Sequence, residues 1–367
     1  MSLAGIIAEK IHREGPISFH DFMEMSLYYP EYGYYSTARD KIGKSGDFYT
    51  SPCVSSLFGE MVARQLEEMW CWLGRQPFSV VEYGAGTGLL CRDILQSLQR
   101  NKELYAGLHY YIIERSPVMR ERTRGLLTDP ARVSWHDDIT EIPPITGCIL
   151  SNELIDNFAV HQVVMEGQLM EVFVDHRGDF TECLRPAAGP LNNYFSELCV
   201  TLPEGYRTEI NLEAIDWIAR ISRALEKGFV LTIDYGFPSR FLYDRHRNNG
   251  TLVCYHRHLV NYSPYTNIGE QDITTHINFS ALCHWGLNNG LEIGGYTNQA
   301  HFLQGLGLAA HLRNMEEEGL MDQWSPDEKV SLVKTLLMDM GQKFNVLIQY
   351  KGLRKPLLSG MRFPQPL

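Results

Sequence analysis

An amide and two carboxylates follow a short apolar run in the stretch ITGCILSNELIDNFAVHQ. Asn152 and Glu153 come directly after the run, and Asp156 follows three residues later. Carboxylates at such a place can anchor and orient a cationic group, and an amide can fix a ligand. Because α/β proteins bind ligands where buried strands leave the sheet, we expect these side chains to be catalytic.

A glycine-rich loop follows another apolar run, in VVEYGAGTGLLCRDIL. The expected ligand-binding residues of this loop are Glu82, Gly84, Ala85, Gly86 and Gly88. A dinucleotide fingerprint requires its third glycine at position 89, which is leucine here. A carboxylate just before the loop would repel a pyrophosphate, whereas it suits the ammonium group of an amino-acid-like ligand. The glycines let the backbone approach such a ligand closely.

Acidic residues also end the next two apolar runs. Glu114 ends YYIIE, and a carboxylate there can accept hydrogen bonds from both ribose hydroxyls. Asp137 and Asp138 end the third run, where either can lie beside a purine amino group. Acids at three successive strand ends match methionine, ribose and adenine. We therefore expect S-adenosylmethionine as the cofactor and S-adenosylhomocysteine as the product.

The elements that must position these residues alternate between strands and helices. The expected strands span residues 78–84, 109–114, 131–137, 147–153 and 228–236, and helices are expected at 89–99 and 213–228. Such alternation predicts an α/β fold with a largely parallel sheet covered by helices. The tail offers strands at 291–297 and 344–352, and a helix that Ser325 would cap.

The expected domains are an N-terminal, mostly helical region over 1–77 and a core over 78–367. Two insertions interrupt the core, at about 161–208 and 237–275. The first alternates between apolar and polar residues and turns at Gly167 and Gly178, which predicts an antiparallel meander.

Composition excludes several classes of protein. The 33 lysines and arginines against 44 acidic residues give a net charge of −11, which disfavours nucleic acid as a partner. No apolar run approaches the roughly 18 residues of a membrane helix, so no membrane insertion is expected. The eight cysteines form no C-x-x-C pair, so no metal is expected.

Seven stretches, in order, carry a family resemblance. They are ISFHDFMEMSLYYPEYGYY, GDFYTSPCVSSLFGEMVA, VVEYGAGTGLL, NELIDNFAVH, IDYG, GTLVCYHRH and GEQDITTHINF. They resemble the MidA-like family of class I S-adenosylmethionine-dependent methyltransferases, which includes a mitochondrial complex I assembly factor. The resemblance implies a Rossmann-like, seven-stranded core that methylates nitrogen. In the mitochondrial relative, the acceptor is an arginine of a respiratory complex subunit.

The resemblance also implies roles for particular residues. The family motifs place Thr50, Ser51 and Pro52 near the cofactor, and Asn152, Glu153 and Asp156 on the acceptor loop. Asp234 in IDYG ends the fifth strand and is a further expected catalytic residue. The chain departs from the family pattern at Asn157 and Ala159, where a small residue and a proline are usual; losing the proline removes a fixed φ from the loop.

The expected reaction is an in-line displacement, in which the protein positions the acceptor and excludes water. An arginine guanidinium is a poor nucleophile, and carboxylates would localise its charge. Two alternatives remain open: a catalytically weak assembly or scaffold factor that binds the cofactor, and a methyltransferase for small molecules. The start of the chain, without a transit presequence, indicates a cytoplasmic bacterial protein or a mature mitochondrial one; the sequence leaves the oligomeric state open.

Other interpretations of single residues also remain open. Glu153 can instead cap the next helix, and Asp156 can instead lie on a solvated face. His258 and His276 are better explained as structural histidines than as bases. The tyrosine-rich segment from Tyr28 to Tyr35, with Phe48 and Tyr49, is either a lid over the ligand or ordinary aromatic packing.

Overall fold

The computed structural model describes residues 2–37, 41, 51–127, 129–320 and 324–367. They form two compact units. The first unit is Met1–Phe48, Ile155–Trp217 and Gly236–His284, and the second is Tyr49–Leu154, Ile218–Tyr235 and Trp285–Leu367. The chain therefore passes between the units immediately after Leu154. The domain boundary expected at residue 77 stays a prediction.

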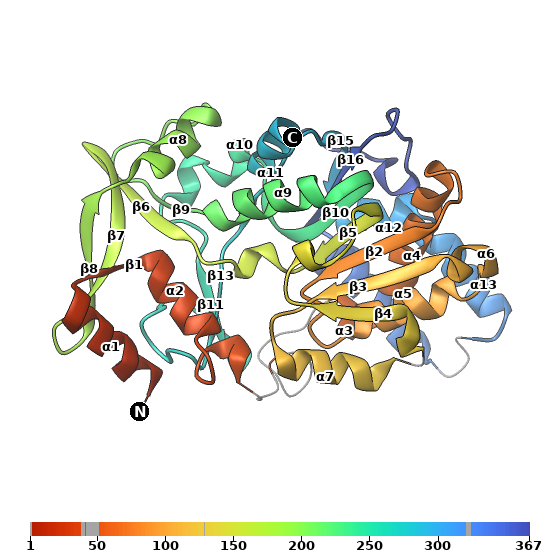
Figure 1. Ribbon diagram of the computed structural model, residues 1–367, viewed down its shortest axis with the longest axis horizontal. Coiled ribbons are helices and arrows are strands. Elements are labelled where there is room, and N and C mark those ends of the chain that lie inside the picture. The colour runs from red at the N-terminus through yellow and green to blue at the C-terminus, as the bar shows by residue number, and fades with distance from the viewer. Residues whose placement is uncertain (1, 38–40, 42–50, 128, 321–323) are drawn as a thin grey trace. The chain divides into compact units, whose positions relative to one another are not determined.

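An open sheet forms the centre of the second unit (Figure 1). Its strands are β2 (Phe78–Tyr83), β3 (Leu108–Ile113), β4 (Val133–His136), β5 (Ile145–Asn152), β10 (Leu225–Phe237), β15 (Glu292–Asn298) and β16 (Phe344–Lys351). They lie in the order β15-β16-β10-β5-β2-β3-β4. β16 runs antiparallel to both of its neighbours, whereas β10, β5, β2, β3 and β4 are parallel. This arrangement confirms the Rossmann-like class I methyltransferase core.

The strand order reverses at β2, which lies between β3 and β5. Open α/β sheets bind their ligands at the carboxyl ends of the strands, beside such a reversal. The loops that follow β2, β3 and β5 are therefore the place where a site is expected.

Helices cover this sheet. The helices of the second unit are α3 (Ser51–Val54), α4 (Ser56–Trp72), α5 (Leu89–Leu98), α6 (Lys102–Ala106), α7 (Pro117–Leu126), α12 (Gln299–Gly305), α13 (Leu308–Glu317) and α14 (Pro326–Lys334). Apolar side chains of α4, α5 and α12 pack against one face of the strands in a continuous core that includes Phe58, Ile94 and Phe302. The expected cap of α14 is confirmed, since Ser325 and Glu328 form a capping box.

Shorter helical turns complete the second unit. They are η2 (Pro130–Arg132), η3 (Ile139–Glu141), the π-helix η6 (Thr335–Asp339) and η7 (Ser359–Met361).

One boundary differs from the expected one. The helical pattern over 213–228 predicted a helix up to Gly228, but α9 (Leu212–Ala224) ends earlier and β10 begins at Leu225. Leu225 pairs with Ile145 of β5, and an irregularity follows before Lys227. Backbone pairing with β5 therefore overrides the local helical pattern.

The first unit contains two antiparallel sheets. Its larger sheet has β1 (Ile17–Ser18), β7 (Gln168–His176), β6 (His161–Glu166), β9 (Arg207–Ile210) and β8 (Phe180–Pro186), where β8 pairs with β7. The smaller sheet has the order β12-β11-β13, with β11 (Val253–His256), β12 (Leu259–Asn261) and β13 (Asp272–Thr274). The pairing of β6 with β7 and of β7 with β8 confirms the antiparallel meander.

Two helices of the first unit continue into the second unit. The following are the remaining elements of the first unit. They are α1 (Leu3–Glu14), α2 (Phe19–Tyr28), η1 (Tyr34–Ser36), η4 (Ile155–Asn157), α8 (Gly189–Glu197), α10 (Ser239–Leu242), η5 (Arg245–Arg247) and β14 (Ile277–Asn278), with α9 and α11 (Phe279–Asn288) shared. β14 pairs with the last two residues of β10.

The tyrosine-rich segment packs into the core of the first unit. Tyr34 is 1% exposed, and the rings of Tyr28 and Tyr35 stack with centroids 5.6 Å apart. For these tyrosines, the structure supports the packing interpretation. Phe48 and Tyr49 lie outside the described residues.

None of the helices within the described ranges has both the length and the hydrophobicity that crossing a lipid bilayer requires.

Candidate functional site

The glycine loop joins β2 to α5 through left-handed backbone. Gly84, Gly86 and Gly88 have φ values of +64°, +53° and +79°, a region that only glycine enters readily. A Cβ on Gly84 would lie 2.7 Å from Leu154 Cδ1, and one on Gly88 would lie 2.8 Å from Thr123 Cγ2. All three positions favour glycine for their conformation, and Gly88 also for space, because a Cβ there would lie 3.0 Å from the Thr123 Cα.

Glu82 lies one strand position before this loop and is 2% exposed. Its carboxylate accepts a hydrogen bond of 2.7 Å from the Tyr110 hydroxyl of β3. Burial raises the pKa of Glu82 to about 7; the Tyr110 hydrogen bond opposes that rise, and the nearby Glu114 adds to it. A cationic ligand beside Glu82 would bind favourably, because its charge would stabilise the ionised form of the carboxylate.

Glu114 follows β3 and binds the glycine loop. Its carboxylate accepts hydrogen bonds from the backbone N–H groups of Ser116, at 2.9 Å, and of Gly86. Burial raises its pKa, while these hydrogen bonds lower it. Glu82 of β2 and Glu114 after β3 are thus close enough to interact with each other, and Glu114 also binds the loop.

Asp137 and Asp138, after β4, have partners within the protein. Asp137 forms an ion pair with Arg120 of α7, and its side chain is 71% exposed. Asp138 accepts from the Thr140 N–H at 3.0 Å and pairs with Arg220 at 2.9 Å. The hydrogen bond from the Thr140 backbone is the main cause of the lowered pKa of Asp138. Either carboxylate would have to bind adenine beside an existing arginine.

The ends of β5 and β10 bring three of the expected catalytic residues together. Asn152 of β5 is paired with Ile233 of β10, so Glu153 and Asp234 follow on adjacent strands. The Glu153 N–H donates to the Ile233 carbonyl at 2.9 Å. Asp234 is fully buried, and one of its carboxylate oxygens accepts from the Leu154 N–H at 3.3 Å. Two carboxylates therefore lie close together near the carboxyl ends of two neighbouring strands.

Glu153 has two unusual properties. Its φ is +51°, a left-handed conformation that residues other than glycine rarely adopt. Burial raises its pKa to about 8; hydrogen bonds from Ser51 and Asn152 oppose this rise, and Asp234 adds to it. Strained backbone and a strongly raised carboxyl pKa both occur preferentially at functional sites.

Ser51 connects Glu153 to a residue that the sequence did not single out. The Ser51 N–H donates to the Glu153 carboxylate at 3.3 Å, and the Ser51 hydroxyl donates to the side-chain amide oxygen of Gln299 at 3.2 Å. Ser51 and Gln299 are fully buried, and Pro52 beside them is buried as well. Thr50 lies outside the described residues.

Two polar atoms of this cluster are buried with no hydrogen-bond partner among the described residues: Asn152 Oδ1 and Gln299 Nε2. Buried polar atoms in native proteins are nearly always satisfied, so each such exception calls for a missing partner. A bound ligand that carries both donors and acceptors would supply these partners.

Asp156 lies in the first unit, in η4, and is 3% exposed. Its backbone carbonyl accepts from the Thr275 N–H at 3.0 Å. The neighbouring Asn157 donates to the Asp272 carboxylate at 3.3 Å, and Ala159 is fully buried. The two departures from the family pattern are thus absorbed by packing and by a hydrogen bond.

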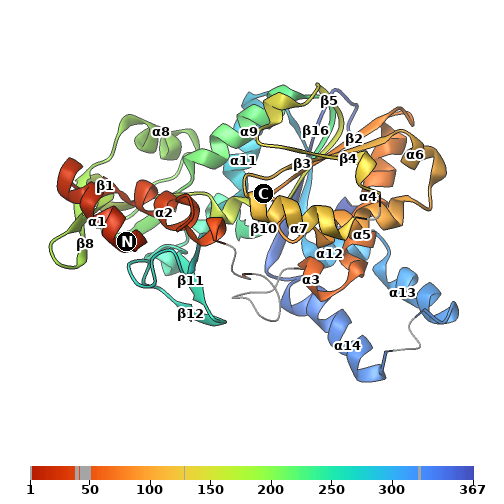
Figure 2. The ribbon, with the colours of Figure 1, turned by 60° about the horizontal axis from the view of Figure 1, so that its bottom comes forward.

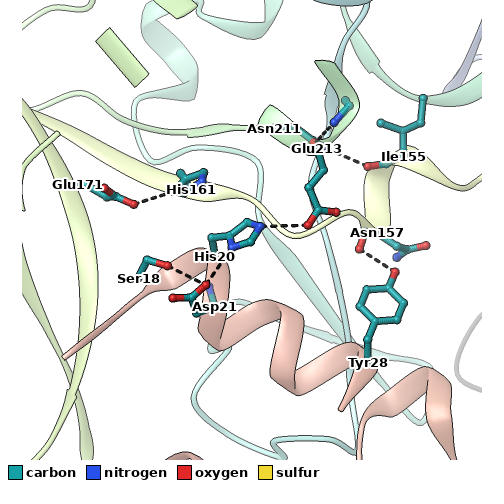
Figure 3. Close-up of polar contacts among 11 residues, drawn as sticks. Ser18, His20, Asp21, Tyr28, Ile155, Asn157, His161, Glu171, Asn211 and Glu213 are labelled. Atoms are coloured by element: carbon teal, nitrogen blue, oxygen red, sulfur yellow. Dashed lines mark hydrogen bonds and ion pairs between the residues drawn. The ribbon is translucent and has the colours of Figure 1, made fainter. Parts of the chain in front are cut away.

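Contacts from two helices hold η4 in place (Figure 3). The Tyr28 hydroxyl of α2 donates to the Asn157 carbonyl at 3.0 Å. Asn211, which caps α9, donates to the Ile155 carbonyl at 3.1 Å. Both contacts fix the backbone on either side of Asp156.

A second group of contacts in Figure 3 joins α2 to α9 through a histidine. His20 lies between Asp21 and Glu213, at 3.2 and 3.0 Å, and it stacks on His161, which pairs with Glu171 at 2.6 Å. The hydrogen bonds to Asp21 and Glu213 raise the pKa of His20 to about 10. His20 is therefore a cation that links the two helices.

Sequence reasoning did not identify Tyr110, Gln299, Arg120 and Arg220 as neighbours of the site. Tyr110 could have been found from the sequence. Val80 pairs with Tyr110, so the Tyr110 side chain lies on the same face of the sheet as Glu82. Gln299 gave no signal, because its place depends on how α12 packs. Within the described residues, no three His, Cys, Asp or Glu side chains are grouped so as to hold a metal ion.

The residues present suit S-adenosylmethionine. Side chains in place of Gly84 and Gly88 would fill the space in the glycine loop, and Glu82 and Glu114 carry carboxylates near it. The unpartnered polar atoms of Asn152 and Gln299 lie at the end of β5 and beside Ser51 of α3. A ligand with a cationic methionine part and a diol would satisfy these groups.

Comparison with known proteins places the chain in a family. Residues 61–297 match the family model Methyltransf_28, described as S-adenosyl-L-methionine-dependent methyltransferase. A crystal structure from Burkholderia thailandensis, bound to S-adenosyl-homocysteine, is 31% identical with a TM-score of 0.88, covering 99% of this chain and 95% of that one.

Two curated relatives are mitochondrial. The protein arginine methyltransferase NDUFAF7 homolog of Drosophila melanogaster is 26% identical over 96% of this chain and 85% of its own length. The human protein arginine methyltransferase NDUFAF7 is 27% identical over 92% and 80%. The chain accordingly belongs to the MidA-like Methyltransf_28 family of enzymes, the S-adenosylmethionine-dependent methyltransferases.

Proposed function

We propose that this methyltransferase transfers its methyl group to a guanidinium nitrogen of an arginine in a protein substrate. The observation that carries the proposal is the pair of carboxylates, Glu153 and Asp234, at the place where the pairing of β5 with β10 ends. A guanidinium presents several N–H donors in one plane and suits two carboxylates better than a neutral acceptor would. The relatives named protein arginine methyltransferases support the same substrate class.

We assign the cofactor to the second unit. The proposed cofactor residues are Thr50, Ser51, Pro52, Glu82, Gly84, Ala85, Gly86, Gly88, Glu114, Asp137 and Asp138. When bound, S-adenosylmethionine supplies an electrophilic methyl group on a sulfonium. Glu82 would bind its ammonium group and Glu114 its ribose hydroxyls, which are the roles that the position of each acid favours.

The acceptor is assigned to Asn152, Glu153 and Asp234 of the second unit, and Asp156 stays a proposed catalytic residue from its sequence motif alone. Glu153 and Asp234 would neutralise the guanidinium and fix its plane, so that one nitrogen faces the methyl group. The cofactor would supply the methyl group: its S–CH3 bond would break as the C–N bond forms, and it would leave as S-adenosylhomocysteine. Glu153 would accept, on a carboxylate oxygen, the proton that the guanidinium nitrogen loses. A carboxyl group whose pKa is raised toward 8 is a better proton acceptor near neutral pH than an ordinary glutamate.

The first experiment combines cofactor binding with turnover. Binding of S-adenosylmethionine and S-adenosylhomocysteine is measured by calorimetry, and transfer of a tritiated methyl group into protein is followed by analysis for methylarginine. For Glu153→Gln, we expect turnover to fall by roughly 100-fold or more with little change in cofactor affinity. Glu121→Gln is the matched control, since Glu121 is 81% exposed on α7.

Two outcomes would contradict the proposal. Methyl transfer by the wild type into small molecules or into residues other than arginine would exclude the substrate class. Full turnover by Glu153→Gln would show that the carboxylate pair does not act on the acceptor.

A further inference from the structure

Gln299, the first residue of α12, is a buried amide that contacts α3 beside it (Figure 2). Its side-chain oxygen accepts from the Ser51 hydroxyl at 3.2 Å, and its side-chain nitrogen is buried with no hydrogen-bond partner in the described part of the chain. An unpaired buried polar group destabilises a fold, and a methionine would fill nearly the same space without that cost. The amide is therefore explained by what it binds and not by packing.

Pairing within the central sheet determines where Gln299 lies. Asn298, the last residue of β15, pairs with Asn345 of β16, and Asn345 also pairs with Asp234 of β10. Since β15 and β10 both run antiparallel to β16, their carboxyl ends point the same way. Gln299 follows β15 directly, so it lies at the strand ends near which Asp234 and Glu153 lie.

The backbone around Gln299 is held on both sides. The Asn298 side chain caps α12 by accepting from the His301 N–H at 2.8 Å. The Ala300 N–H donates to the Gly341 carbonyl at 2.9 Å. A side chain that extends from such a fixed backbone can act as an anchor for its hydrogen-bond partner.

Ser51, the partner of Gln299, begins a helix of only four residues, α3. A single helical turn is marginal by itself, so side-chain contacts have to fix its first residue. The Ser51 hydroxyl has two acceptors, the Gln299 amide oxygen at 3.2 Å and the Met340 Sδ at 3.6 Å. Because a thioether is the weaker acceptor, the amide of Gln299 is the main contact that fixes Ser51.

The backbone N–H of Ser51 extends this restraint to Glu153. It donates to Glu153 Oε1 at 3.3 Å, and the Asn152 amide donates to the same oxygen at 3.2 Å. The other carboxylate oxygen, Oε2, accepts no hydrogen bond from the residues that the structure describes. Two donors on Oε1 fix the plane of the carboxylate and leave Oε2 for the acceptor nitrogen and its proton.

We propose that Gln299 is a positioning residue for methyl transfer: it anchors Ser51, which holds the Glu153 carboxylate in the orientation that binds the acceptor. A neutral side chain suits this role. A third carboxylate would repel Glu153 and Asp234, and a basic side chain would compete with a cationic acceptor for them. The inference rests on the proposed function, because that function gives Glu153 its role.

Two substitutions break this link from its two ends. Gln299→Met removes the amide and nearly conserves the volume of the side chain, so the fold should persist. Ser51→Ala removes the hydroxyl and leaves the backbone N–H in place. Gln304→Met is the matched control, because Gln304 lies on the same helix and is exposed. If thermal melts show that Gln299→Met does not fold, Gln299→Asn, whose amide is too short to reach Ser51, replaces it in every comparison.

The acceptor probe is a heat-treated protein extract from source cells in which the gene for this chain has been deleted. Tritiated S-adenosylmethionine at saturating concentration supplies the label, and methylarginine is quantified after hydrolysis. At sub-saturating extract, the initial rate should fall about tenfold in Gln299→Met and in Ser51→Ala, because a displaced catalytic group loses much of its effect. The double variant should fall no further than either single variant, since both changes break one link. Gln304→Met should match the wild type.

A pH profile distinguishes positioning from a general loss of structure. Burial raises the pKa of Glu153 to about 8, and the hydrogen bond from Ser51 opposes that rise. A weaker hydrogen bond lets the pKa rise further, so the increase in rate between pH 6 and 9 should move to higher pH in Gln299→Met. The affinity of Gln299→Met for S-adenosylhomocysteine, measured by calorimetry, should equal that of the wild type.

Each other outcome overturns a definite statement. No methylarginine with the wild type would refute the proposed function and this inference with it. A wild-type rate in Gln299→Met, or single effects that multiply in the double variant, would refute the inference alone. A lowered rate with an unchanged pH profile would make the role of Gln299 structural. An affinity for S-adenosylhomocysteine at least tenfold weaker would make Gln299 a cofactor-binding residue instead.

Discussion

Burial raises the pKa of Glu153, and the carboxylate of Asp234 adds to that rise from the adjacent parallel strand. Parallel pairing of β5 with β10 places Asn152 opposite Ile233, so the acids that follow cannot separate without breaking the sheet. Two carboxylates held together in this way repel each other until a cation lies between them. The pair of acids at these strand ends would therefore bind a cationic acceptor, and the pH dependence of the reaction rate tests this.

The first prediction concerns kcat/KM for the protein acceptor. Glu153 has a pKa of about 8, so it is mostly neutral at pH 6 and ionised above pH 8. Because only the ionised form pairs with a guanidinium, kcat/KM should rise about tenfold per pH unit below 8 and level off above it. Initial rates from pH 6 to 9 measure this limb.

Asp234→Asn provides the control for that assignment. Removing the neighbouring negative charge lowers the pKa of Glu153, so the limb should shift to lower pH even if the overall rate falls. A limb that stays in place in Asp234→Asn would assign the titration to another group.

The alternation of strands and helices was enough to predict the sheet. Each expected parallel strand is present, because runs such as 147–153 are apolar enough to be buried on both faces. The strand order was not predicted, since local patterns do not encode pairing between β2 and β5. The end of α9 was missed because pairing of Leu225 with Ile145 is a long-range interaction.

The candidate site was predictable where it follows strand ends and not where it depends on packing. Glu82 lies near the end of β2, and Glu114 and Glu153 directly follow β3 and β5, so all three could be found from the sequence. Gln299 reaches Ser51 across almost 250 residues of chain, and that contact exists only after α3 and α12 have packed. The arginine partners of Asp137 and Asp138 were missed for the same reason.

The second prediction tests the ribose assignment of Glu114. In Glu114→Ala, a carboxylate that would accept from two hydroxyls is lost, and charge-assisted hydrogen bonds contribute about 1.5–3 kcal/mol each. We expect cofactor affinity to fall at least about tenfold in calorimetry, with Glu121→Ala unchanged. Wild-type affinity in Glu114→Ala would remove Glu114 from the cofactor site.

The third prediction concerns Glu82, whose pKa burial raises to about 7. A cationic ligand favours its ionised form, so binding at pH 6 should release protons and be weaker than at pH 7. In Glu82→Gln, affinity should fall and its dependence on pH between 5.5 and 7 should flatten. Calorimetry in two buffers of different ionisation enthalpy counts the protons; an unchanged release in Glu82→Gln would contradict the assignment.

The last prediction concerns stability and His20. Hydrogen bonds to Asp21 and then Glu213 raise its pKa to about 10, from 6.5 in the unfolded chain. A raised histidine pKa stabilises the folded state fully below pH 6.5, and the stabilisation disappears as pH rises through 10. Because the carboxylate partners are partly exposed, at 54% and 38%, we expect the charged His20 to add only about 1–2 kcal/mol to the free energy of unfolding at pH 6.

Thermal melts of wild type and His20→Gln should therefore differ most at pH 6, less at pH 8 and hardly at pH 10. His246→Gln, at an exposed histidine of the same unit, is the control and should melt like the wild type at every pH. A difference in melting temperature for His20→Gln that persists at pH 10 would mean that packing, and not charge, stabilises this histidine.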